Sequence, residues 1–231
     1  MLRLSSKIAI RASFIINIFF IAFSITFLIA HAKFANPSSQ IPSGVISIVI
    51  DVKGLKLIVY KGNLPQKTFP VAVGKPGTPS PVGNWRIVSK EKWGEGFGSH
   101  WLGLNVPFGV YGIHGTNNPS SIGNIISAGC IRMFNNDVEE VYNMVRVGTP
   151  VHIIGDPFMG RRVLVRGLAG TDVLFLQKRL KQLGLFHYNP DGIFGYDTER
   201  AVIEFQKQNR LPLTGQVKYS EYSKLKLINT E

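Results

Sequence analysis

Residues 45–74 read VISIVIDVKGLKLIVYKGNLPQKTFPVAVG, a stretch dominated by valine, isoleucine and aromatic side chains. β-Branched and aromatic residues are enriched in strands, and short runs of them between turn residues are typical of a β-sheet. The stretch divides into three such runs, at residues 45–52, 55–60 and 67–74, with glycines at the turns between them. It therefore predicts that the fold begins as a sheet.

The same pattern continues downstream. Four more short strands are expected, at residues 85–88, 101–104, 110–114 and 151–154. Asn136 followed by Glu139 has the spacing of a capping box, which predicts one helix running to about Arg146. Residues 45–155 are therefore expected to form a mainly β domain, a compact sandwich or a barrel-like fold.

Helical periodicity replaces the strand pattern after a linker at residues 156–166 that contains glycine, proline and three arginines. Val173, Leu176 and Leu180 lie on one helical face, and a second apolar stripe follows around Phe205. Residues 167–228 are thus predicted to form a small all-α domain of three helices. Its size is near the lower limit for independent folding.

Residues 1–32 have the features of an export segment. Three basic residues and no acid precede an uncharged apolar run at residues 13–30, and Ala30-His31-Ala32 resembles a cleavage site. The segment is either a cleaved signal peptide or a retained membrane anchor, and residues 33–44 are predicted to be a tether. The rest of the chain is expected outside the cytoplasm, so it is secreted or held at the membrane only through this segment.

The net charge of +12 is spread along the chain, with +3 in residues 1–32, +4 in residues 33–160 and +5 in residues 161–231. No dense basic block is present, and an exported protein meets no genome, so we expect no nucleic-acid partner. A diffuse positive excess suits residence near anionic wall polymers or lipid head groups, or is simply a soluble basic surface.

Cys130 is the only cysteine, so it cannot form an internal disulfide in an exported protein. It is either a reactive group or a small hydrophobic side chain. Gly129 before it and Arg132 after it favour chemistry. The chain has no His-Glu-x-x-His motif and no second cysteine, so we predict neither a metal site nor a cofactor.

Three histidines, His100, His114 and His152, lie in the β-rich part of the chain. A single histidine near a strand is more often structural than catalytic, but His114 ends a strand-like run and is followed by Gly115. A thiol nucleophile needs a base to remove its proton. The glycine-flanked pair therefore favours His114 as the base for Cys130.

These residues carry a family resemblance. Ile113-His114-Gly115-Thr116 and Ser127-Ala128-Gly129-Cys130-Ile131-Arg132-Met133 resemble the signature of the bacterial L,D-transpeptidases of the YkuD type. The segment GKPGTPSPVG at residues 74–83 is similar to a further motif of that family, and about half of the chain is covered. Many members have a second histidine where this chain has Ala128, which would leave His114 as the sole imidazole base.

The resemblance implies the L,D-transpeptidase fold and a two-step exchange on peptidoglycan stem peptides. Cys130 would attack the carbonyl that joins the third residue, usually a diamino acid, to the terminal D-alanine. D-Alanine would leave, and a thioester would remain on Cys130. The amine of a second stem would then attack and form a cross-link. His114 would transfer the protons, the Gly115 carbonyl would fix its tautomer, and amides around Gly129 and Cys130 would hold the oxyanion.

Two further residues have open roles. Arg132 would either clamp a substrate carboxylate or pair structurally with Asp137 or Glu139. Ser127 would either shape the turn or donate a hydrogen bond to substrate. Together with Gly129, these two residues are the predicted substrate-binding set.

The tail resembles the three-helix peptidoglycan-binding module of many wall enzymes, through Leu176-Gln177, Asp191-Gly192, Phe205-Gln206 and Thr214-Gly215. Its expected partner is the wall polymer, which places the protein in the cell wall or on the outer face of the cytoplasmic membrane. Two other functions stay open. One is hydrolysis with water as the acceptor, and the other is wall binding without catalysis.

Overall fold

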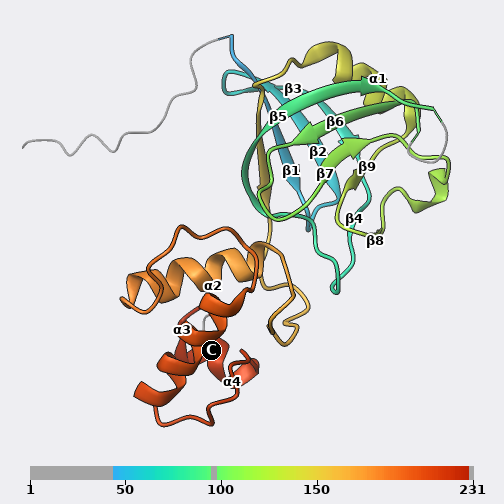
Figure 1. Ribbon diagram of the computed structural model, residues 1–231. Coiled ribbons are helices and arrows are strands. Elements are labelled where there is room, and N and C mark those ends of the chain that lie inside the picture. Colours follow the sequence, from blue (N-terminus) through green and yellow to red (C-terminus); the bar gives the residue numbers. More distant parts are fainter. Residues whose placement is uncertain (1–43, 95–97, 229–231) are drawn as a thin grey trace, which may run out of the picture. The chain divides into compact units, whose positions relative to one another are not determined.

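The computed structural model describes residues 44–94 and 98–228 of the 231-residue chain (Figure 1). The predicted export segment, residues 1–32, lies outside the described residues, as does all of the tether except Gly44. Within these two described ranges, the structure contains no helix that is both long and apolar enough to cross a membrane.

Eight strands form one curled, mixed sheet in the order β3-β2-β1-β10-β5-β6-β7-β9 (Figure 1). Their bounds are β1 Ile46–Asp51, β2 Lys56–Lys61, β3 Leu64–Pro70, β5 Gly83–Lys92, β6 His100–Leu104, β7 Tyr111–His114, β9 Ile131–Arg132 and β10 Pro150–Ile154. Two short strands, β4 (Val73–Gly74) and β8 (Ile125–Ser127), pair separately. The prediction of a mainly β region is confirmed.

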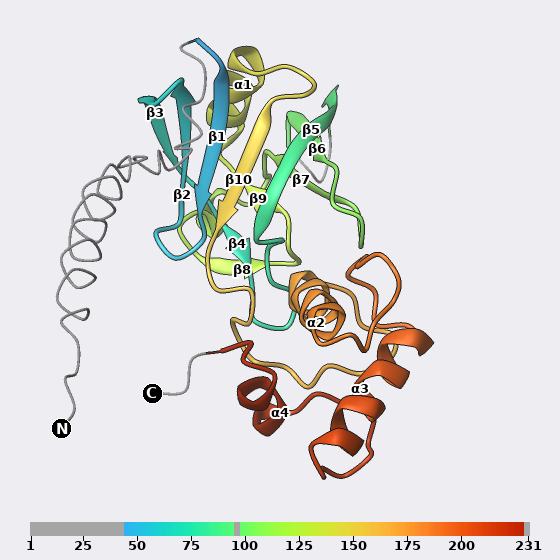
Figure 2. The ribbon, with the colours of Figure 1, turned by 90° about the vertical axis from the view of Figure 1, so that its left-hand side faces the viewer.

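The first strand of the stretch that begins the fold, β1, lies in the interior of this sheet. Ile48 and Ile50 of β1 are fully buried, in agreement with the alternation expected for a strand. β1 pairs antiparallel with β2 and parallel with β10, where Ile48 lies opposite Val151. Figure 2 shows β10 between β1 and β5. β10, the last strand of this region, therefore keeps β1, the first strand, in the interior of the sheet.

One helix, α1 (Asn135–Met144), packs against β6 and β7 and buries Val138 and Val141. The predicted capping box is wrong: the N-cap is Phe134, and no side chain caps the helix. The N-cap lies two residues before the expected Asn136. Asn135, the first residue of the helix, uses its side chain as an acceptor for two backbone N–H groups of neighbouring loops. The helix also ends at Met144 rather than near Arg146.

Two strands were not predicted from the sequence, β8 and β9. Each has at most three residues, which is too short to show a period of two. They exist because other strands pair with them: Val73 lies opposite Ile125, and Ile113 lies opposite Ile131. Tertiary pairing rather than local propensity determines these strands.

The tail forms three helices, α2 (Thr171–Gln182), α3 (Tyr196–Gln208) and α4 (Tyr219–Lys224), which confirms the small all-α prediction. Their core is one cluster of buried apolar side chains, among them Leu176, Leu180, Phe194, Phe205 and Tyr222. The motif residues are structural here.

Two buried glutamines tie the loops of the tail to its helices. The Gln177 side chain accepts from the amides of Asp191 and Gly192, and its Nε2 contacts the Thr198 hydroxyl at 3.0 Å. Gln206 repeats the arrangement, because it accepts from the Gly215 amide and donates to Thr214 Oγ1. Each amide side chain satisfies the buried polar groups of one loop.

Candidate active site

The pairing of β7 with β9 brings the two sequence motifs together. The strands run parallel, with Ile113 opposite Ile131 and His114 opposite Arg132. Continuing this register by one residue places Gly112 beside Cys130. The Gly112 backbone does form a hydrogen bond with the Cys130 sulfur. A short strand pair therefore sets the thiol and the imidazole next to each other.

The side chains of β7 and β9 point alternately to the hydrophobic core and to the opposite face, where the site lies. Ile113 and Ile131 are fully buried and belong to the hydrophobic core. Successive side chains in a strand point to opposite faces, so His114 and Arg132 project from the other face. Cys130 precedes Ile131 directly and shares that face. One cavity of about 320 Å³ is lined by His114, Thr116, Asn117, Asn118, Ser127, Ala128, Cys130 and Arg132.

The His114 ring is buried and held from two directions. Its Nδ1 lies 2.6 Å from the Gly115 carbonyl oxygen, which can only accept a hydrogen bond. Nδ1 therefore carries the proton, and Nε2 is the basic nitrogen of the neutral ring. The Trp101 ring stacks on the imidazole with a centroid separation of 5.7 Å. A side chain at Gly115 would meet Asn135 Oδ1 at 2.1 Å, so only glycine fits there.

The Cys130 thiol is half-buried, and burial raises its pKa. Two weaker effects act in the opposite direction: the hydrogen bond from the Gly112 backbone and the positive charge of Arg132 both favour the thiolate. Burial dominates, so the resting group is the neutral thiol. A nucleophilic reaction at this residue therefore requires a base.

The turn before Cys130 is closed by Ser127. The Ser127 hydroxyl donates to the Cys130 carbonyl at 2.6 Å and accepts from the Gly129 amide at 3.0 Å. The Gly129 amide was expected to be an oxyanion donor, but it is already used within the turn. Gly129 has φ +118°, and a side chain there would meet Tyr111 Cε1 at 2.8 Å. The position requires glycine for its backbone conformation and for space.

Arg132 lines the cavity and makes no ion pair with Asp137 or Glu139 in the described part of the chain. The structural pairing left open by the sequence is therefore not found. Among the described residues, no aspartate or glutamate lines the cavity, so Arg132 gives this lining a positive charge. A cavity with this charge favours a ligand that carries a carboxylate.

The other two histidines of this region do not line the cavity. His100 is buried against Tyr142, and its Nδ1 lies 2.9 Å from Ser99 Oγ. His152 Nδ1 lies 2.7 Å from Asn84 Oδ1. Both side chains have structural partners away from the thiol.

Sequence reasoning missed three residues around the site. Tyr111 packs beside Gly129, and its pKa is raised first by burial and then by the nearby Cys130. Trp101 supports the His114 ring. Asn135 Oδ1 accepts from the amides of Ser99 and Thr116 at 3.2 and 3.1 Å. The only signal in the sequence was their nearness to the motifs, because their contacts depend on strand pairing.

The third motif, residues 74–83, forms hydrogen bonds with the residue at which the Cys130 turn begins. The Ser127 carbonyl accepts from the Lys75 amide at 3.1 Å and lies 3.2 Å from Thr78 Oγ1. Ser80 Oγ accepts from the Gly74 amide at 2.9 Å. This loop therefore holds the strand that leads into the Cys130 turn.

Comparisons with known proteins identify two family matches. Residues 46–153 match the model described as "L,D-transpeptidase catalytic domain", and residues 169–219 match the "Putative peptidoglycan binding domain". The chain is 47% identical over 107 residues to the "Putative L,D-transpeptidase YkuD" of Bacillus licheniformis. That match covers 46% of this chain and 64% of the relative, so the chain spans less than two thirds of that protein's length.

A second relative is covered more fully. The "Putative L,D-transpeptidase YqjB" of Bacillus subtilis is 31% identical over 125 residues, which covers 47% of this chain and 71% of the relative. Among solved structures, the catalytic domain of an L,D-transpeptidase from E. faecium matches with a TM-score of 0.43 and 24% identity, over 48% of this chain and 98% of that one.

Proposed function

Because this chain belongs to the L,D-transpeptidase family of the YkuD type, we propose that it exchanges acyl groups on peptidoglycan stem peptides through a thioester at Cys130. The observation that carries the proposal is the β7–β9 pairing. It sets Cys130, His114 and Arg132 on one face of two strands, at one cavity. A nucleophile, its base and a cation for the substrate are the groups that acyl transfer from an acidic peptide requires.

In the first step, His114 Nε2 takes the thiol proton and the sulfur attacks the carbonyl carbon of the donor stem. The carbonyl oxygen becomes an oxyanion in the tetrahedral intermediate. Because the Gly129 amide is occupied by Ser127, the Cys130 amide is the donor we assign to the oxyanion. The bond to the D-alanine nitrogen then breaks, His114 protonates the leaving amine, and a thioester remains on Cys130.

In the second step, the diamino-acid amine of another stem attacks the thioester carbon. His114 accepts a proton from the incoming amine, the carbon–sulfur bond breaks, and Cys130 regains a proton. The product is a cross-link between two third residues. Water in place of the amine would give hydrolysis through the same intermediate.

We assign supporting roles to three residues. The Gly115 carbonyl keeps the proton on His114 Nδ1 and leaves Nε2 basic. Arg132 binds a stem carboxylate, since it has no acidic partner among the described residues. Ser127 shapes the turn, because its hydroxyl already bonds both the Gly129 amide and the Cys130 carbonyl.

The two-part organisation belongs to the same proposal. Residues 45–155 would perform the chemistry, residues 156–166 would link, and residues 167–228 would hold the enzyme on the wall polymer. The match of residues 169–219 to a peptidoglycan-binding model supports the second role. With residues 1–32 as a signal or anchor, the enzyme would work outside the cytoplasm.

Product analysis on purified muropeptides tests the proposal. Mass spectrometry should detect loss of D-alanine and a product in which two stems are joined, and Cys130→Ala should give neither. Circular dichroism of that variant checks that it is folded. Released D-alanine without joined stems would favour the hydrolytic rival. Full turnover by Cys130→Ala would contradict the thioester mechanism. If the wild type shows no turnover, wall binding without catalysis is the function that remains.

A further inference from the structure

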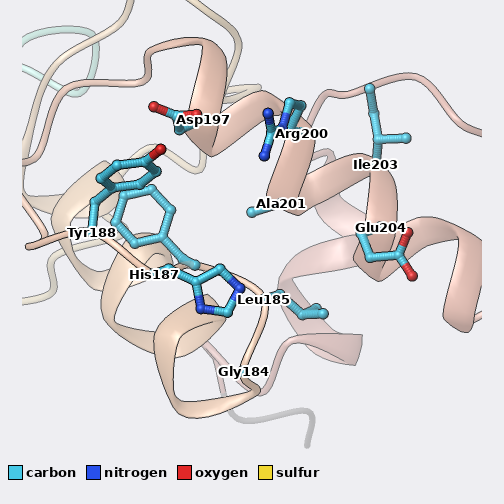
Figure 3. Close-up of a pocket in the computed structure, with 10 residues that line it drawn as sticks. Gly184, Leu185, His187, Tyr188, Asp197, Arg200, Ala201, Ile203 and Glu204 are labelled. Carbon is cyan, nitrogen blue, oxygen red and sulfur yellow. The ribbon is translucent and has the colours of Figure 1, made fainter.

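The tail carries a hollow that no part of the proposed reaction uses. It lies between the loop that follows α2 and the outer face of α3, and its volume is about 430 Å³ (Figure 3). This is within the range of sites that bind small ligands. Its lining residues are Gly184, Leu185, Phe186, His187, Tyr188, Asp197, Arg200, Ala201, Ile203 and Glu204.

One wall of the hollow carries three charges that do not pair with each other. Asp197, Arg200 and Glu204 are separated by three and four residues, which places them on one face of α3. Among the described residues, none of the three makes an ion pair. The guanidinium of Arg200 contacts the Tyr196 ring, with 5.8 Å from Cζ to the centroid. The wall therefore presents a negative, a positive and a negative group in a row.

The opposite wall carries apolar and aromatic side chains together with His187, and its aromatic part is held in place. Phe186 is buried in the tail core, and the Tyr188 ring packs on it edge to face at 5.8 Å. Lys181 Nζ donates to the Tyr188 carbonyl at 3.0 Å. Tyr188 is nevertheless 56% exposed. A preorganised wall with an exposed ring offers contact area at little entropic cost.

The hollow continues into a second one. A neighbouring cavity of about 190 Å³ shares Phe186, Tyr188 and Asp197 with the first and extends to Asp191 and Tyr196. The two together form a groove along the first turns of α3. We call it the α3 groove, and its lining extends along α3 from Tyr196 to Glu204.

We propose that the α3 groove binds the peptide stem of peptidoglycan, with the zwitterionic end of the diamino acid on α3. The side-chain ammonium would pair with Asp197, and the neighbouring carboxylate of the stem would pair with Arg200, one turn further along α3. The alanine methyl groups would face Leu185 and Tyr188. This inference rests on the wall-binding role proposed above and names the part of the polymer that is recognised.

The charge pattern favours the peptide over the glycan strand. The sugar backbone carries no ammonium group, so it would leave Asp197 and Glu204 without a cationic partner. Charged side chains that line a binding groove favour ligands with complementary charges, and they disfavour ligands that leave them desolvated and unpaired. A stem with a free amine and a free carboxylate satisfies Asp197 and Arg200 together.

An NMR titration of the full chain tests the site. The chain carries Cys130→Ala to prevent turnover, and the probe is a soluble stem tetrapeptide with a free diamino-acid amine. Amide shifts are expected at residues 185–188 and 200–204, separately from any at the Cys130 cavity. Arg200→Glu should weaken binding at the groove about tenfold or more, because it removes a charge-assisted contact. Arg200→Lys should retain part of the affinity.

Two controls accompany these variants. Lys207→Glu makes the same charge change as Arg200→Glu on the same helix, at an exposed residue that does not line the groove, and should bind the stem as the parent does. A probe whose diamino-acid amine is acetylated should bind the groove about tenfold more weakly, because Asp197 loses the ammonium. Thermal unfolding followed by circular dichroism confirms that each variant is folded.

Sedimentation with wall sacculi separates this inference from the function on which it rests. If the parent chain pellets with sacculi but no groove amide shifts with the stem probe, wall binding stands and the groove assignment is wrong. Groove shifts with stem-free glycan chains instead of the peptide would also overturn it. If the parent chain does not pellet, the wall-binding function itself fails.

Discussion

At the scale of single residues, the site depends on opposing effects on one thiol. Burial raises the pKa of Cys130, while the Gly112 backbone and the Arg132 charge lower it. The balance keeps the resting thiol neutral, and in the proposed mechanism His114 takes its proton. Reactivity would thereby be confined to the position where base and substrate meet, which would protect the thiol from side reactions.

The first prediction concerns Arg132. Iodoacetamide modification of Cys130, followed by intact mass against pH, should rise with a midpoint above the ordinary thiol value of 9.0. Arg132→Gln removes a positive charge that stabilises the thiolate, so its midpoint should lie at higher pH than that of the wild type. Arg146→Gln, which changes an exposed arginine outside the cavity, is the control. A midpoint that moves to lower pH in Arg132→Gln would contradict this account.

The second prediction concerns the base. His114→Ala should reduce the rate of acylation by roughly 10²–10⁴-fold, the usual contribution of a positioned general base. His152→Ala should cost little, because its ring contacts Asn84 and does not line the cavity. Stopped-flow measurement of acyl-enzyme formation compares the two. Equal losses in both variants would require the base to be reassigned.

At the scale of elements, α1 and two loops are joined through one side chain. Asn135 begins α1, and its Oδ1 accepts from the amides of Ser99 and Thr116. Thr116 follows the His114-Gly115 pair, and Ser99 precedes β6. The carbonyl that orients the imidazole is therefore held by the start of a helix, not by its own strand alone.

The third prediction follows from that contact. Asn135→Ala leaves two partly buried N–H groups without their acceptor, and each such loss costs roughly 1–3 kcal/mol. The free energy of unfolding, measured with urea, should fall accordingly, and acylation should slow because Gly115 is less well fixed. Asn136→Ala is the matched control, since that residue is the exposed neighbour of Asn135 on α1 and its replacement should change neither quantity. A stable, fully active Asn135→Ala variant would show that the contact is dispensable.

At the scale of the whole molecule, chemistry and polymer binding are assigned to separate stretches of sequence. Among the described residues, the cavity that contains Cys130 is lined by residues between 114 and 132, and the α3 groove by residues of the tail. A second binding site on the same polymer raises the local concentration of substrate at the first. The α3 groove would thus increase turnover on intact wall without touching the reacting atoms.

The fourth prediction tests this division by truncation. A chain that ends at Pro157 lacks α2, α3 and α4 but keeps every residue that lines the catalytic cavity. Its turnover of a soluble tetrapeptide should match that of the full chain, while its sedimentation with sacculi should be lost. A folded truncated protein that is inactive on the soluble peptide would mean that the tail completes the catalytic cleft.

The sequence by itself determined the classes of structure and the two motifs. Strong β runs such as residues 45–52 and the helical stripe through Leu176 carry their own periods, so they could be predicted locally. Cys130 and His114 can be recognised by their chemistry, and the glycines next to them by the backbone conformations that glycine adopts most readily.

Only the tertiary structure decided the rest. β8 and β9 are too short for periodicity and form through their partners, and the contacts of Tyr111, Trp101 and Asn135 follow from strand register. The Gly129 amide looked available in sequence, yet a side chain two residues away satisfies it, because hydrogen bonds depend on geometry that spacing does not specify.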